Sequence, residues 1–169
     1  MNPPTSSRPL PLRIELKKGR DSRPTLVCIR SDGSRTWSAV HAHFPVHDIT
    51  HFAVESVLGF SQAFFGLIAA GWSIDEFAER GAAARMPAEA LIAELVVGLL
   101  DQERASEQLL RADDLNLILN QALLARGWDP FRPILDQELG TIRKLRGELQ
   151  TAWSGLDSGQ AITMEFPAG

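Results

Sequence analysis

The hydrophobic pattern of the chain changes its period once, near Pro45, and this change constrains the fold more than any other feature. Before it, short segments alternate apolar and polar residues, as half-buried strands do. After it, apolar residues recur at helical spacing for most of the chain. Strands that precede helices, instead of alternating with them, indicate an α+β fold and argue against a doubly wound parallel sheet.

Four segments have the character of strands. Residues 12–17 alternate apolar and charged side chains, residues 25–30 are mostly apolar, and residues 35–41 follow the Asp-Gly turn signal at positions 32 and 33. The alternation returns at residues 161–166 near the C-terminus. We therefore predict a three-stranded antiparallel meander plus a C-terminal strand, packed against five or six helices.

Glycine, proline and capping residues delimit the helices. The first is expected to begin at Pro45 and to end near residue 60. A helix that opens after Pro87 is apolar around so much of its circumference that we expect it to be central. The last helix is predicted over residues 130–153, where a continuous apolar stripe covers one face.

The composition is that of a folded protein with one domain. Of the 169 residues, 44% are hydrophobic and 22% are charged. A chain of this size and composition can bury a hydrophobic core without disulfides or bound metals to brace it. Residues 1–9 are rich in proline and serine and predict a disordered tail, which leaves residues 10–169 as a single α+β domain. The longest apolar run, residues 95–100, falls far short of the roughly 20 residues that span a bilayer, so no membrane partner is expected.

Location and partners can also be predicted. The first residues lack the apolar core of a secretory signal and Cys28 is the single cysteine, which together favour a cytoplasmic location. Basic residues concentrate in residues 17–23, but no aromatic residue lies there to stack on bases, so no nucleic-acid partner is expected. The apolar residues at 60–68 would suit a homodimer, and a place in the core explains them equally well.

All four histidines lie within eleven positions of one another. His47 and His51 are four residues apart, so one helix face can present both imidazoles to one divalent metal ion, with zinc as the expected metal. A third ligand is needed. Glu55 lies one helical turn further on, whereas His43 and His41 lie two residues apart on the preceding strand and share a face. The pattern leaves the choice among these three open.

The segment His47-Asp48-Ile49-Thr50-His51 resembles the H-E-x-x-H helix of zinc metallopeptidases. The resemblance implies that both histidines bind zinc and that Asp48 takes the place of the general base, although its side chain is one methylene shorter. Asp48 and Glu55 are the candidate catalytic residues. The longer string Phe-Pro-x-His-Asp-x-Thr-His-x-x-x-Glu is similar to a group of small uncharacterised bacterial proteins, and this resemblance implies no mechanism.

Two functional hypotheses follow. The first is a cytoplasmic metal-binding protein, with a metal-dependent hydrolase as its enzymatic form. The alternative is a non-enzymatic interaction module in which the histidine cluster only joins strand to helix. The chain contains neither a Gly-x-Ser-x-Gly nucleophile motif nor a glycine-rich phosphate loop, so neither a small-molecule substrate nor a peptide ligand can be specified from the sequence.

Overall fold

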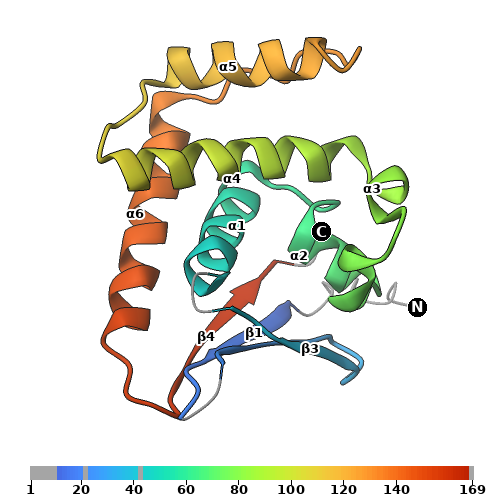
Figure 1. Cartoon of the computed structure of the whole chain (residues 1–169), viewed down its shortest axis with the longest axis vertical. Helices are drawn as coiled ribbons and strands as arrows, with labels where there is room; N and C mark the ends of the chain where they lie inside the picture. The colour runs from blue at the N-terminus through green and yellow to red at the C-terminus, as the bar shows by residue number, and fades with distance from the viewer. Residues whose placement is uncertain (1–10, 21–22, 42–43, 168–169) are drawn as a thin grey trace, which may run out of the picture.

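The computed structural model describes residues 11–20, 23–41 and 44–167, and places an antiparallel sheet beneath layers of helices (Figure 1). The tail predicted at residues 1–9 lies outside the described residues. The sheet has the order β3-β2-β1-β4, and every neighbouring pair of strands is antiparallel. Its strands are β1 (Leu12–Lys17), β2 (Thr25–Ile29), β3 (Arg35–Ala39) and β4 (Ala161–Phe166). The predicted α+β fold, a meander completed by a C-terminal strand, is confirmed.

The register of the sheet gives it one buried face. Ile14 of β1 lies opposite Cys28 of β2 on one side and Met164 of β4 on the other, and all three are buried. The alternation seen in the sequence therefore marks the face that packs on the helices. On β3 the same face carries the polar residues Thr36 and Ser38, which are only half-buried. The sheet is therefore less completely covered near that edge.

The helices stack away from the sheet. Figure 1 shows α1 above the sheet, α4 across α1, α5 beyond α4, and α6 running along the side of α1 toward β4. None of the helices formed by the described residues combines the length and the apolar character of a bilayer-crossing segment. The helical elements are α1 (Phe44–Leu58), α2 (Phe64–Ala69), the 3-10 helix η1 (Asp75–Ala78), α3 (Ala82–Arg85), α4 (Ala88–Ser106), α5 (Ala112–Leu124) and α6 (Asp136–Ser154).

Helix α1 joins the two halves of the core. Ile49 and Phe52 pack with the sheet, while Ala53, Val54 and Leu58 pack with α4, α5 and α6. The helix that opens after Pro87, expected to be central, packs between α1 and α5. Because α1 is enclosed on both sides, ten of its 15 residues are buried, and these include the polar residues Asp48, Thr50, His51 and Glu55.

Two expectations change in detail. The last helix begins at Asp136 and not at residue 130, because Pro133 interrupts the segment and Asn116 of α5 bonds both the N–H and the carbonyl oxygen of Ile134. The apolar residues at 60–68 that would suit a homodimer include Phe60, Phe65 and Ile68, and these side chains are buried in the chain's own core.

Candidate metal centre

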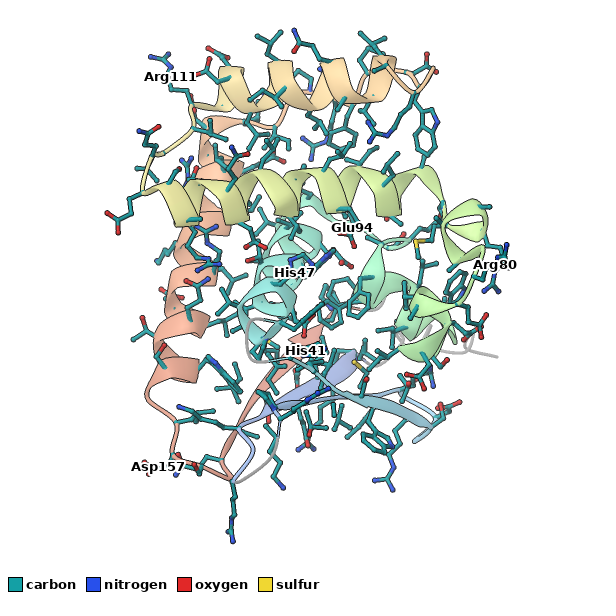
Figure 2. All side chains as sticks on the ribbon, viewed as in Figure 1. His41, His47, Arg80, Glu94, Arg111 and Asp157 are labelled. Atoms are coloured by element: carbon teal, nitrogen blue, oxygen red, sulfur yellow. The ribbon has the colours of Figure 1, made fainter. Side chains whose placement is uncertain are left out.

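The candidate metal centre lies between α1 and α4. His47 and His51 come from successive turns of α1, and Glu94 comes from α4. Figure 2 shows His47 and Glu94 on these two helices. One ligand atom from each of the three residues lies within 4.8 Å of the others, so the group can hold a metal ion. Exposure increases across the group: the side chain of His51 is 3% exposed, that of His47 31% and that of Glu94 53%. The site is thus anchored in the core and reaches the surface through Glu94.

Each imidazole has a carboxylate behind it. Nδ1 of His47 lies 2.8 Å from Oδ2 of Asp101, and Nδ1 of His51 lies 3.1 Å from Oε1 of Glu55. When Nδ1–H donates to a carboxylate, Nε2 carries the free lone pair and the ring is fixed in orientation. Both rings are therefore fixed in orientation, and in the neutral tautomer with Nδ1–H each histidine would offer Nε2 to a metal ion.

The two supporting carboxylates are themselves held by the fold. Glu55 is fully buried, and its Oε2 accepts the backbone N–H of Phe65 at 2.9 Å, at the start of α2. The chain is tightly packed here, because a Cβ on Gly66 would collide with the backbone of Ser61. Asp101 accepts a second hydrogen bond from the hydroxyl of Thr50 at 3.3 Å. The support of both histidines thus extends into the folded core.

The carboxylates beside the buried His51 keep its imidazole protonated. Burial alone would lower the pKa of His51, but its hydrogen bonds to Glu55 and Glu94 raise it to about 10. Nε2 of His51 lies 3.2 Å from Oε1 of Glu94, so the proton at this position lies between two groups of the metal-binding triad. Burial also raises the pKa of Glu55, against the hydrogen bond from His51. A metal ion bound here would replace that proton.

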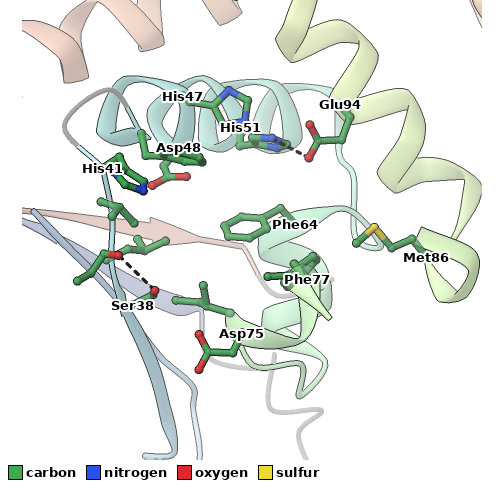
Figure 3. A pocket seen from close by; sticks show the side chains of 16 residues that line it. Ser38, His41, His47, Asp48, His51, Phe64, Asp75, Phe77, Met86 and Glu94 are labelled. Atoms are coloured by element: carbon green, nitrogen blue, oxygen red, sulfur yellow. Dashed lines mark hydrogen bonds and ion pairs between the residues drawn. The ribbon is translucent and has the colours of Figure 1, made fainter. Parts of the chain in front are cut away.

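A pocket of about 470 Å³ opens beside the triad. Figure 3 shows His47, His51 and Glu94 at one end of it and Asp75 at the other. Its walls come from β3, α1, α2, η1 and the start of α4. The apolar side chains that line it are Leu26, Ala39, Val40, Phe44, Phe64, Ile74, Phe77, Ala78 and Met86.

Asp48 also lines this pocket, although it is only 5% exposed. Its Oδ2 atom is buried without a hydrogen-bond partner in the described part of the chain. Burial raises the pKa of Asp48 to about 6, while the neighbouring imidazoles of His51 and His47 act in the opposite direction. An ionised carboxylate in this setting destabilises the fold, which is typical of groups kept for function.

The substitution Asp48→Asn should stabilise the metal-free protein at pH values above about 6. The folded pKa lies above the unfolded value of 3.8, so the contribution of Asp48 to stability is fully present below 3.8 and lost as pH rises through about 6. The asparagine does not titrate, and the gain in unfolding free energy should reach roughly 1–3 kcal/mol. Urea denaturation in chelator, on both sides of that pH, measures it. Equal stability of the two proteins at alkaline pH would contradict the assignment.

The structure brings together some of the residues that the sequence nominated. His47 and His51 meet in the triad, and Asp48 faces the adjoining pocket. His41 is exposed at the pocket wall and is not part of the triad, because β3 ends at Ala39 before reaching it. His43 lies outside the described residues. Glu55 contacts the far side of His51, at Nδ1, and neither joins the triad nor lines the pocket.

Two site residues did not emerge from the sequence, Glu94 and Asp101. They lie seven positions apart on α4, which places them on one helix face, two turns from each other. They flank the apolar run of residues 95–100, one at each end, and that pattern was the available signal. It does not say which other helix these carboxylates face.

Comparisons of the chain with protein-family models, with curated proteins and with solved structures gave no match. Function is therefore inferred from the geometry of the site. That geometry comprises two histidines whose Nδ1 atoms are fixed, a glutamate opposite them, and an apolar pocket with one unpartnered carboxylate.

Proposed function

We propose that the protein binds one divalent metal ion through His47, His51 and Glu94 and uses it as a metal-dependent hydrolase. The observation that carries the proposal is the carboxylate behind each histidine, Asp101 behind His47 and Glu55 behind His51. Such second contacts fix the tautomer and raise the basicity of metal-binding histidines. A cluster that only joined two elements would not need a carboxylate behind each of two imidazoles that lie beside the same acidic side chain.

Zinc is the metal that we propose. Two histidines and one glutamate form the ligand set of several catalytic zinc sites, in which a further position stays open for water or substrate. The same donors suit ferrous iron, which the metal analysis below distinguishes. When bound, such an ion polarises a carbonyl oxygen or lowers the pKa of a bound water. The pocket beside the triad gives a substrate access to that open position.

Asp48 is the proton acceptor in this proposal. It lies next to His47 on the helix, lines the same pocket and has an oxygen without a partner. Glu55 has a different part: both of its oxygens are engaged, one with Nδ1 of His51 and one with the N–H of Phe65. Glu55 is therefore a positioning residue, which holds His51 and does not touch substrate.

One observation favours the alternative, a non-enzymatic module with a structural cluster. His51 is paired with Glu55 at one ring nitrogen and with Glu94 at the other, so these two carboxylates compensate the buried charge at this position. A structural cluster of this kind would stabilise the junction between α1 and α4. The two hypotheses differ in whether metal enters the site.

Metal analysis of protein prepared without an affinity tag tests the proposal. We expect one equivalent of zinc per chain, lost in chelator and restored on reconstitution, because three ligands converge with their supports in place. The zinc-loaded protein should hydrolyse at least one member of a panel of amide, ester and phosphoester substrates. The Asp48→Asn variant should keep the metal and lose the hydrolysis. Protein that takes up no metal even after reconstitution would leave the structural module as the better explanation.

A further inference from the structure

The pocket beside the triad has an acidic character. Its acidic lining residues are Asp48, Asp75 and Glu94, and no lysine or arginine of the described residues joins them. The basic groups in the lining are the imidazoles of His41, His47 and His51. Glu55 and Asp101 lie directly behind the two histidines. The four carboxylates of the centre, those of Asp48, Glu55, Glu94 and Asp101, outnumber the charges of a single divalent ion. An excess of negative charge therefore remains around the pocket even when a metal is bound.

Asp48 is the carboxylate of this centre that has an oxygen without a hydrogen-bond partner in the described chain. Among the carboxylates of the centre, Glu55, Glu94 and Asp101 each have an imidazole within hydrogen-bond distance. Oδ2 of Asp48 has no partner within the described chain. A buried carboxylate of this kind is strongly favoured to pair with a donor that enters from outside. The open side of Asp48 is the pocket.

We propose that the pocket binds a small molecule with an apolar body and a protonated amine, and that the amine pairs with Asp48. This inference rests on the proposed function for the adjoining metal site and names the class of its substrate: the amine pairs with one oxygen of Asp48, and the other oxygen remains as the proton acceptor. The apolar body would lie against Phe64 and Phe77, whose ring centroids are 4.7 Å apart and which line the pocket together. The ammonium group would pair with the carboxylate of Asp48, which lines the pocket and has an oxygen without a hydrogen-bond partner in the described chain.

The size and polarity of the pocket agree with this class of ligand. A volume of about 470 Å³ falls in the range of roughly 300–1,000 Å³ that is common for small-molecule sites. Most of its lining is apolar, and a few polar groups lie at its two ends, where they can fix the orientation of a ligand. An anionic ligand of the same size would meet Asp48 and Glu94, and no lysine or arginine lies among the described lining residues to balance them. The imidazoles of His47 and His51 in that lining are already paired with carboxylates.

Three probes share one apolar body and differ in the charge of their polar end, so a comparison of their affinities measures the effect of charge. They are phenylbutylamine, phenylbutanol and phenylbutyrate. Binding is followed by NMR shifts of the metal-free protein in chelator at mildly alkaline pH, so that no probe can bind through a metal. We expect the amine to bind at least about tenfold more tightly than the alcohol, because only the amine forms a charge-assisted hydrogen bond. The butyrate should bind more weakly than either.

Two variants test which residue causes the preference for the amine. Asp48→Asn removes the charge and should reduce the preference for the amine over the alcohol to within about twofold, since both probes then meet a neutral amide. Asp75→Asn is the matched control: this residue lines the other end of the pocket and is exposed, so the preference should persist.

Each outcome decides the inference. A preference for the amine that is lost in Asp48→Asn and kept in Asp75→Asn supports the inference. It is overturned if the alcohol or the butyrate binds as tightly as the amine, if Asp48→Asn keeps the preference, or if none of the probes binds at millimolar concentration. Because metal is absent throughout, amine binding by a protein that never takes up zinc would contradict the proposed hydrolase and leave the amine site standing.

Discussion

Glu94→Gln is expected to reduce metal affinity by more than the roughly 10–100-fold that loss of a carboxylate behind a histidine produces. Glu94 is the one carboxylate of the triad and half of it is exposed, so its replacement removes a ligand without opening the core. Competition with a chromophoric chelator measures the change. Affinity should also rise with pH, because metal uptake has to displace the proton held at His51.

Two further variants serve as references for the size of this loss of metal affinity. Asp101→Asn weakens the support of His47 but keeps all three ligands, so its loss of affinity should be smaller than that of Glu94→Gln. Glu148→Gln changes an exposed glutamate on α6 and should leave affinity unchanged. If Glu94→Gln binds metal as well as the parent does, the triad is not the metal site.

The fold followed from the sequence because its signals are local. Alternation at residues 12–17 and 161–166 is a property of each strand by itself, and with one buried face it also sets which residues point inward. The helices after Pro45 were detectable from spacing in the same way. The start of the last helix was misplaced because its cause is distant, namely the two hydrogen bonds between Asn116 and Ile134.

The site could be predicted only as far as one helix extends. The spacing of His47 and His51 fixes two ligands, since both lie on α1. The third ligand depends on how α4 crosses α1, and that crossing is decided by packing that no local pattern encodes. For the same reason Glu55 was nominated as a ligand or a catalytic residue. Its position at i+4 from His51 is consistent with both, and only the tertiary structure shows it facing Nδ1 and the start of α2.

The burial of α1 also changes how the histidines can be tested. With this helix enclosed by the sheet and by α4, removal of His51 would leave Glu55 as a buried carboxylate without its partner. A variant that lacks both histidines would therefore lose stability as well as metal. Loss of stability on its own does not decide between a metal site and a structural cluster, because the same contacts serve both. Glu94 and His47, which are more exposed, separate the two better.

Glu55→Ala is expected to have the largest effect on stability, lowering the unfolding free energy of the metal-free protein by about 3–5 kcal/mol. The substitution leaves the protonated His51 without the carboxylate at Nδ1, and it leaves the N–H of Phe65 buried without an acceptor. Chemical denaturation in chelator measures the loss.

The pH dependence of that loss identifies its source. The pKa of His51 is raised from 6.5 to about 10 in the folded protein, so its stabilising contribution is fully present below 6.5 and disappears as pH rises through about 10. The difference between parent and Glu55→Ala should therefore be largest at neutral pH and shrink under alkaline conditions. Glu94→Gln, which alters a half-exposed partner of the same histidine, should cost no more than about 1 kcal/mol. A loss for Glu55→Ala that stays constant as pH rises would instead assign its importance to the hydrogen bond from Phe65, with no part for the charge of His51.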